Sequence, residues 1–380
     1  MARRVVSTEI EFYPEADCLE GYPHPRHAHS VYGHTVAKQL LSAAVKADKL
    51  HHAWIITGSE GIGKATLAYQ FAKYVLAAPQ DRIANDEILA VRSDSVAAHQ
   101  VKSLSHPGLL VLRRNYDIKN KRFTTAITVD EVRRLRSFLN HSPGDRAWRV
   151  IIVDRADELN TNAANALLKS LEEPPARTVF LLIAVEPGRL LPTIRSRCRH
   201  LALQPLSAAD ATQATAQAAE AAGTPPDAQP NWNGLVDAAG GSVRRLLTFA
   251  ADGGLDVAAT VDELLSACAG ASDWPKQHAL AERLAPAQMQ QTYQLFLDLF
   301  FERLAELIKS RATGAGSERR RQLAARLIRD GTLASWVELW ETLQRERTAV
   351  QALNLDRTAF LLDAMARIQN LAGEPSNMRA

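Results

Sequence analysis

Cysteine is scarce in this sequence, and its placement excludes two kinds of structure. The 380 residues include three cysteines, Cys18, Cys198 and Cys268, which lie far apart in the chain. Cysteines this isolated cannot supply the closely spaced ligands of a structural zinc site or the framework of a small disulfide-rich domain. The pattern therefore indicates a reducing compartment and no metal site built on cysteine.

Long apolar runs and a strong excess of charge are also missing. No stretch approaches the ~20 uninterrupted apolar residues that a membrane-spanning helix needs. The opening stretch, MARRVVSTEIEFYPEAD, begins basic, soon becomes acidic and lacks the apolar run of a signal peptide. The formal net charge of +3 is too small to indicate nucleic-acid binding by itself. These absences favour a cytoplasmic protein.

The composition is that of an ordinary globular protein, with 46% hydrophobic and 23% charged residues. A chain of this length suggests two or three domains. In the first half, nearly continuous apolar runs alternate with helical patterns. This predicts an α/β domain with a parallel sheet that helices cover on both faces. The predicted strands are residues 53–57, 109–113, 149–154, 178–185 and 199–203. The last of them alternates between apolar and polar residues, as an edge strand does.

After about Pro205 the strand pattern ends. Residues 207–223 predict a helix, GGSVRRLLTFAA begins another, and the pattern is helical from about 260 to 372. A break at 314–317, GAGS, separates two long helices. One apolar stripe consists of Leu295, Leu299, Phe300, Leu304 and Leu307.

The stretch GSEGIGKAT, residues 58–66, has the spacing of a phosphate-binding loop, G-x-x-x-x-G-K-[ST], but it lacks one functional group. It follows a predicted strand and precedes a helical apolar face, the context in which loop N–H groups surround phosphates. The candidate nucleotide-binding residues in it are Gly58, Gly61, Gly63, Lys64 and Thr66. Ala65 stands where a hydroxyl normally ligates Mg²⁺. Thr66 is turned by about 100° from that position, so we do not expect it to replace the hydroxyl. The alternative is a turn that only connects strand and helix.

A second candidate lies at RVIIVDRADELN, residues 149–160. Asp154 ends an apolar strand and is placed to hold Mg²⁺ beside a phosphate loop. ATP hydrolysis also needs an acid that polarises the attacking water, and AAA+ ATPases carry a glutamate next. Arg155 stands there instead, and a cation cannot accept the water's proton. The alternative is that Asp154 only caps a turn.

Three further stretches are rich in arginine. PTIRSRC, residues 192–198, places Arg195, Ser196 and Arg197 between two predicted strands, either as a solvated basic loop or as a phosphate contact. Arg244 lies in the first turn of a predicted helix, which is weak evidence alone. RRNYDIKNKR, residues 113–122, is better explained as a charged hairpin than as a contact with a phosphate backbone.

Together these stretches resemble the clamp-loader family of AAA+ proteins over about residues 24–372. The resemblance rests on LHHA before the first strand, the phosphate loop, NALLKSLEEPP, SRC, GSVRRLL and, near the end, LNLDRTAFLLDAM. It implies an AAA+ nucleotide-binding-type module over 24–205, a helical lid over 206–258 and a helical collar over 259–372. An irregular leader, 1–23, would precede them and a tail, 373–380, would follow.

The departures from the family pattern concern hydrolysis. Motor subunits of the family, gamma or tau, carry a threonine after the loop lysine, Asp-Glu after the second strand and a threonine pair after the next. Here Ala65, Arg155 and the pair Ala184-Val185 stand at those places, while SRC is kept, unlike in delta subunits. The combination is similar to a family subunit that does not hydrolyse ATP. In such a subunit Arg197, with Ser196, would act as an arginine finger on ATP bound by a neighbour, and Arg244 would be the lid's sensor arginine.

The resemblance also implies partners. They are gamma/tau and delta subunits in a hetero-pentamer, the sliding clamp, and primed DNA reached through the assembled complex, within a DNA polymerase III holoenzyme. No cofactor is required, although weak ATP or ADP binding stays open. No zinc is expected, because the four-cysteine module of many members is missing from about 78–107. The alternatives are an active ATPase of the gamma/tau type and an AAA+-derived regulator that binds DNA.

Overall fold

The computed structural model describes residues 14–16, 18–83, 88–140, 147–226, 232, 236, 239–251, 254–270, 274–316, 318–353 and 355–373. The chain divides into two compact units, Met1–Leu247 and Thr248–Ala380.

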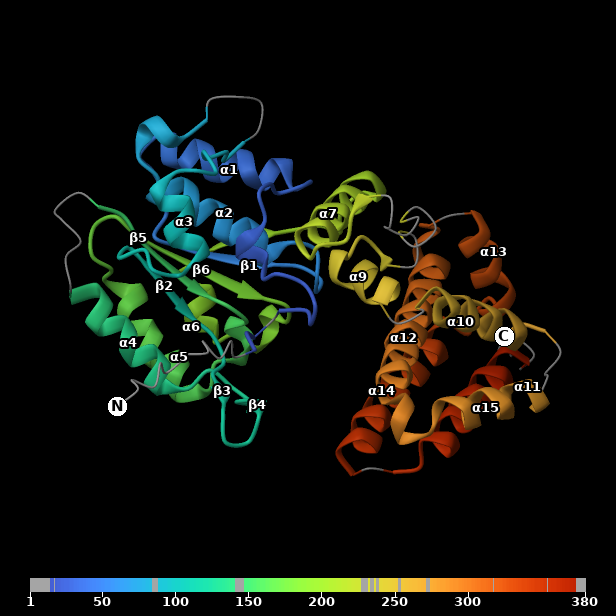
Figure 1. Ribbon diagram of the computed structural model, residues 1–380. Helices are drawn as coiled ribbons and strands as arrows, with labels where there is room; N and C mark the ends of the chain where they lie inside the picture. The colour runs from blue at the N-terminus through green and yellow to red at the C-terminus, as the bar shows by residue number, and fades with distance from the viewer. Residues whose placement is uncertain are drawn as a thin grey trace, which may run out of the picture. The chain divides into compact units, whose positions relative to one another are not determined.

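The first unit is built on a sheet of five parallel strands in the order β2-β5-β6-β1-β7 (Figure 1). The strands are β1 (Ala53–Thr57), β2 (Leu109–Leu112), β5 (Arg149–Val153), β6 (Thr178–Ala184) and β7 (Arg199–Ala202). The predicted parallel sheet is confirmed, and so is the edge position of β7. Every strand begins at the predicted residue, and all but β1 end one residue earlier than predicted.

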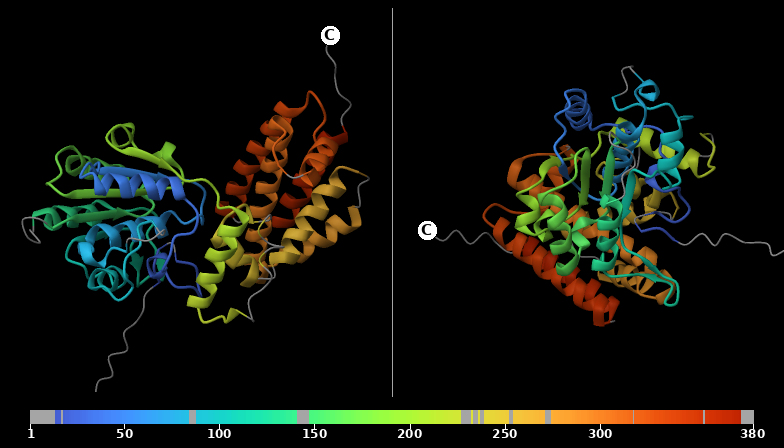
Figure 2. Two further views of the ribbon diagram at one scale, coloured as in Figure 1. Left: turned by 90° about the horizontal axis from the view of Figure 1, so that it is seen from above. Right: turned by 90° about the vertical axis from the view of Figure 1, so that its left-hand side faces the viewer.

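Helices cover both faces of this sheet, as predicted (Figures 1 and 2). One face carries α1 (Thr35–Lys46), α2 (Lys64–Leu76) and α3 (Val96–Lys102), and the other carries α4 (Val129–Asn140), α5 (Thr161–Glu172) and α6 (Pro192–Arg195). The remaining helices of this unit are α7 (Ala208–Ala221) and α9 (Val243–Ala251), which extends past Leu247, with 3₁₀ turns η1 (Pro25–His27), η2 (Pro79–Asp81), η3 (Ala156–Glu158) and η4 (Pro187–Arg189).

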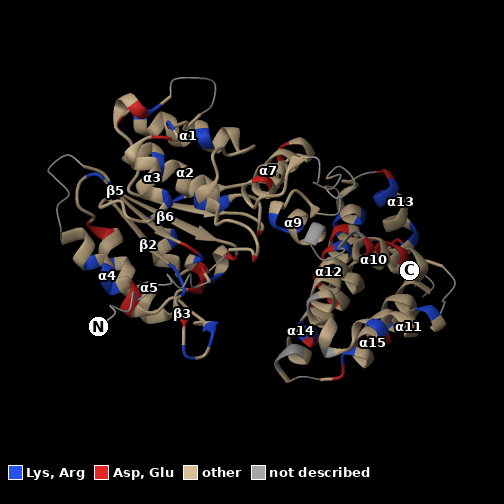
Figure 3. Cartoon of the chain, in the orientation of Figure 1, with Lys and Arg blue, Asp and Glu red and all other residues tan. Residues whose placement is uncertain are grey.

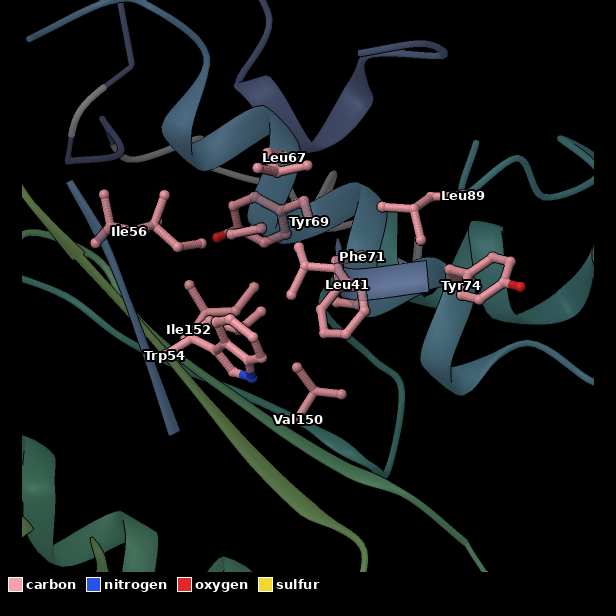
Figure 4. Close-up of a cluster of buried hydrophobic side chains, with 14 of the residues drawn as sticks. Leu41, Trp54, Ile56, Leu67, Tyr69, Phe71, Tyr74, Leu89, Val150 and Ile152 are labelled. Carbon is pink, nitrogen blue, oxygen red and sulfur yellow. The ribbon is translucent and has the colours of Figure 1, made fainter. Parts of the chain in front are cut away.

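Side chains of the central strands alternate between two cores. Trp54 and Ile56 point into the core beneath α1–α3, whereas Ile55 belongs to the core on the other face. Figure 4 shows the first core, where Trp54 lies near Phe71 of α2. Both faces are buried, so the strands contain few polar residues. Each large apolar side chain buried there contributes about 1.5–3 kcal/mol relative to exposure.

The stretch at 113–122 forms a hairpin of β3 (Tyr116–Asp117) and β4 (Arg122–Phe123). Asp117 accepts hydrogen bonds from the backbone N–H groups of Lys119 and Asn120, which fixes the turn. Lys and Arg residues, drawn in blue, lie along the hairpin (Figure 3). The charged hairpin is therefore confirmed, while a contact with nucleic acid stays untested.

In its described part, the second unit contains helices and no strand. They are α10 (Gly254–Cys268), α11 (Trp274–Leu284), the 3₁₀ turn η6 (Ala287–Met289), α12 (Gln290–Thr313), α13 (Glu318–Leu327), α14 (Leu333–Leu353) and α15 (Arg357–Gly373). Helix α12 packs against α10, α11, α13 and α14. Of the predicted stripe, Leu299, Phe300, Leu304 and Leu307 are buried, and Leu295 is half-buried. The predicted break is present, since Gly314 ends α12 with φ 70°.

The predicted domain boundaries are only partly visible here. Helix α10 begins at Gly254 and packs against α12 and α15. The separation of a lid from the AAA+ module stays a prediction, and most of the predicted tail lies outside the described residues. Among the described helices, none is both long enough and apolar enough to cross a membrane.

Candidate nucleotide site and arginine loop

The phosphate-type loop connects β1 to α2, which begins at Lys64. Gly58, Gly61 and Gly63 have φ values of 142°, 77° and 101°, a region that side chains rarely adopt. Gly61 is also crowded, because a Cβ there would lie 2.3 Å from Oγ of Ser242. The glycines are therefore required by the shape of the loop, whether or not a nucleotide binds.

Lys64 is bound to its own loop. Its side chain is buried, and Nζ donates hydrogen bonds to the carbonyl oxygens of Gly58 and Ser59, both at 2.7 Å. Burial lowers the pKa of Lys64, the Glu60 carboxylate opposes this and the Arg155 guanidinium adds to it, and the resulting pKa is about 8. Two of the three ammonium N–H groups are thus already engaged inside the chain.

Asp154 and Arg155 follow β5 at the carboxyl ends of the strands, where the phosphate-type loop also lies. Asp154 is 2% exposed. Arg155 has φ 57°, and its Nη2 lies 3.0 Å from Oε1 of Glu158. A guanidinium therefore occupies the place where hydrolysis needs a carboxylate. With Ala65 in place of a hydroxyl, the residues present do not fit a Mg²⁺–ATP complex that is set up for hydrolysis.

Residues at the start of α9 form hydrogen bonds with the backbone of the loop. Oγ of Ser242 donates to the Glu60 carbonyl oxygen at 2.9 Å, and the Val243 N–H donates to the Gly61 carbonyl oxygen at 2.9 Å. Arg244 is brought to the loop in this way, with Nε 3.6 Å from Oε1 of Glu60. The structure thus gathers the loop residues, Asp154 and Arg244, although whether they bind nucleotide stays a prediction.

Loop residues 60–66, with Asp154, Arg155 and Arg244, line a cavity of about 200 Å³. Its other walls come from α7 and from the segment 19–32, whose role the sequence did not reveal. On α7, Gln217 bonds to both backbone groups of Ser30, accepting from N–H at 3.1 Å and donating to the carbonyl oxygen at 3.3 Å. Nζ of Lys73 donates to the Ala28 carbonyl oxygen at 2.9 Å. Thr66 also lines the cavity.

The leader is anchored by a half-buried carboxylate. Glu15 accepts hydrogen bonds from Arg26, at 2.6 Å to Nη2, and from Arg113 after β2. Burial raises the pKa of Glu15, but the two guanidinium groups outweigh it and lower the pKa to about 2. Within the predicted irregular leader, Leu19, Tyr22 and Pro23 line the cavity.

The SRC stretch lies at the amino ends of the strands, opposite the phosphate-type loop. It occupies the turn between α6 and β7, where Arg197 is 36% exposed. Around it, one pocket is lined by His51, His52, Leu171, Glu172 and residues 196–199. The stretches LHHA, LEEPP and SRC therefore meet. This meeting point precedes β1 and β7, whereas the phosphate loop follows β1. About 15–20 Å of extended chain separates the two ends of β1, so Arg197 does not reach its own loop.

Among the described residues, no group of three or more His, Cys, Asp or Glu side chains could hold a metal ion. The histidines at 24, 27, 29 and 34 form the densest cluster in the sequence. One of them, His24, is buried, and burial together with Arg26 lowers its pKa to about 3.

Residues 33–207 match the family described as DNA polymerase III, delta subunit. The chain is 37% identical over 147 residues to DNA polymerase III subunit delta′ of Pseudomonas aeruginosa, covering 39% of this chain and 41% of that protein. It is 34% identical over 162 residues to the Escherichia coli subunit delta′, covering 42% and 45%. A gamma subunit of Buchnera aphidicola is 28% identical over 190 residues, covering 49% and 47%.

The matches thus span less than half the length of these relatives. The family match over residues 33–207 includes the loop, the end of β5 and the SRC turn. Over residues 33–207, the chain is thus similar to DNA polymerase III clamp-loader subunits, the delta′ subunits among them.

Proposed function

We propose that this chain is a delta′-type subunit of a DNA polymerase III clamp loader that does not hydrolyse ATP. It supplies Arg197 to ATP held by a neighbouring subunit and so helps to load the sliding clamp on primed DNA. The observation that carries the proposal is the separation of two sites. The chain's own loop lacks the groups for hydrolysis, while Arg197 lies at the opposite end of β1, directed to no site of its own.

The chemistry of Arg197 supports a role toward phosphate. A guanidinium keeps its charge at all relevant pH values and presents several N–H donors to phosphate oxygens. Arg197 lies in a turn and is partly exposed, with Ser196 beside it, so a neighbouring chain can approach it. An arginine supplied in trans typically contributes ~10³–10⁵ in kcat.

The proposed partners are gamma/tau and delta subunits in a hetero-pentamer, together with the sliding clamp. Primed DNA would be reached through the complex, in the cytoplasm. The collar helices of the second unit would join the subunits. We propose no required cofactor and no zinc, with at most weak ATP or ADP binding at the loop. Elemental analysis of the purified chain tests the zinc statement, and stoichiometric zinc would contradict it.

The first experiment measures ATP turnover by the isolated chain. A catalytic contact of this kind typically contributes ~10²–10³ in rate, so the lack of both the hydroxyl at Ala65 and the acid at Arg155 should leave only background. The gamma relatives favour the alternative, an active ATPase. Turnover of about 1 s⁻¹ or more that Lys64→Ala abolishes would establish the alternative.

The second experiment uses a complex reconstituted with the cognate gamma/tau and delta subunits. Arg197→Ala should leave assembly intact and should lower ATP hydrolysis and clamp loading. The matched variant Arg195→Ala, two residues earlier in α6, should lower them less. Only one of several ATP sites loses its arginine, so the whole complex slows by less than the single-site factor. Unchanged clamp loading by Arg197→Ala across a range of ATP concentrations would exclude the role in trans.

A further inference from the structure

Glu172 contacts the arginine of the SRC turn directly. Nη2 of Arg197 lies 2.8 Å from Oε1 of Glu172, and Nη1 donates to the carbonyl oxygen of Thr193 at 3.0 Å. We propose that Glu172 is a positioning residue for Arg197, which it orients together with the Thr193 carbonyl before a neighbour's ATP arrives. The inference rests on the proposed function and adds a residue to the same site.

Both anchors of the guanidinium belong to elements that the core holds in place. Glu172 is the last residue of α5, whose Leu167 and Leu171 are 0% and 1% exposed. Thr193 lies in α6, which packs against α5 and buries Ile194 completely. An acceptor on each helix therefore defines a direction for the guanidinium plane, which a single contact from a flexible residue could not do.

The contacts leave donors available. A guanidinium has five N–H groups, and the contacts with Glu172 and Thr193 engage one on each terminal nitrogen. The side chain is still 36% exposed. Ordering a mobile arginine side chain costs conformational entropy when it binds ATP. Contacts that the arginine already makes within its own chain reduce this entropy cost. Glu172 therefore acts through the orientation of Arg197 and not through contact with ATP.

The next residue offers a matched control. Glu173 is also a glutamate of the LEEPP stretch, but it has left the helix, with φ −131° and ψ 69°. No ion pair joins it to another residue of the described ranges. Glu172 and Glu173 thus share chemistry and neighbourhood, and they differ in the contact with Arg197.

The test is a double-mutant cycle in the reconstituted complex, with ATP turnover measured in the presence of clamp and primed DNA. The variants are Glu172→Ala, Arg197→Ala, the double variant and Glu173→Ala. Glu172→Ala should lower kcat by up to about fivefold at unchanged KM, because a contact between partly exposed charges contributes at most ~1 kcal/mol. Glu173→Ala should match the wild type. The double variant should match Arg197→Ala, since Glu172 acts only through that arginine.

Glu172→Gln keeps one acceptor oxygen and should lose less activity than Glu172→Ala. It also replaces Glu172→Ala in the cycle if that variant assembles poorly. A wild-type kcat for Glu172→Ala, or a loss that adds in full to that of Arg197→Ala, would overturn the positioning role. An unchanged rate for Arg197→Ala alone would instead overturn the proposed function, so the two failures are distinct.

Discussion

Glu60 faces Arg155 across the phosphate-type loop, with 3.8 Å between Oε1 and Nη1. The same oxygen lies 3.6 Å from Nε of Arg244. One loop carboxylate therefore partly neutralises two cations that border the cavity, while Lys64 is occupied by loop carbonyls. Part of the positive charge that would attract a triphosphate is therefore already balanced within the chain.

Glu60→Gln should tighten the binding of ATP to the isolated chain. The change removes a negative charge that competes with phosphate for both arginines. Because Glu60 is 55% exposed, solvent screens the effect, and we expect about fivefold. Titration of a fluorescent ATP analogue measures it, with Glu263→Gln, at an exposed position of α10, as the control. An affinity that stays the same or falls would show that Glu60 does not restrain the site.

Gly61→Ala should destabilise the first unit by about 2 kcal/mol, both through its φ of 77° and through the 2.3 Å approach of a Cβ to Ser242. The matched change Gly188→Ala has open space around the new Cβ and should be nearly neutral. Urea denaturation of both variants gives the comparison. Equal stabilities would mean that the loop and the start of α9 do not pack as described.

The Glu15 anchor predicts a pH dependence of stability. Its pKa in the folded chain is about 2, below the ordinary value of 4.5, so unfolding takes up a proton. The stabilisation by Glu15 should be complete above pH 4.5 and should be lost as the pH falls toward 2. Free energies of unfolding for the wild type and Glu15→Gln should therefore differ at pH 6 and converge between pH 4.5 and 2. A constant difference across that range would contradict the ion pairs with Arg26 and Arg113.

A truncated chain that ends at Ala251 should fold but should fail to join the complex. The two units have separate cores, and the cut falls between α9 and α10. Circular dichroism and a cooperative unfolding transition report folding, and co-elution with the cognate subunits reports assembly. Full assembly of the truncated chain would show that the second unit is not the oligomerisation domain.

The sheet was predictable because its signal is local. Residues buried on both faces of β1, β5 and β6 must be apolar, and the sequence shows them as runs. The loop, the strand-end Asp154 and the SRC turn were recognisable for a similar reason, since each carries its spacing within a few residues. No local sequence pattern, in contrast, indicates that Glu15 pairs with Arg113, 98 positions later, or that Gln217 hydrogen-bonds to Ser30.

The contact between Glu172 and Arg197 could likewise not be predicted from a local sequence pattern. Both residues lie in recognisable stretches, LEEPP and SRC, but their distance depends on how α5 and α6 pack. Helix α10 begins at Gly254, before the helical pattern that the sequence shows from about 260, and it packs against α12.

The two ends of β1 give this module a direction. One end carries the phosphate-type loop, and the other carries the turn with Arg197. If Arg197 acts on a neighbour's ATP as proposed, a ring of such modules that all face the same way would activate its ATP sites in one direction around the ring. A subunit that supplies an arginine but does not hydrolyse ATP would interrupt that order, and the remaining sites of the ring would no longer be equivalent.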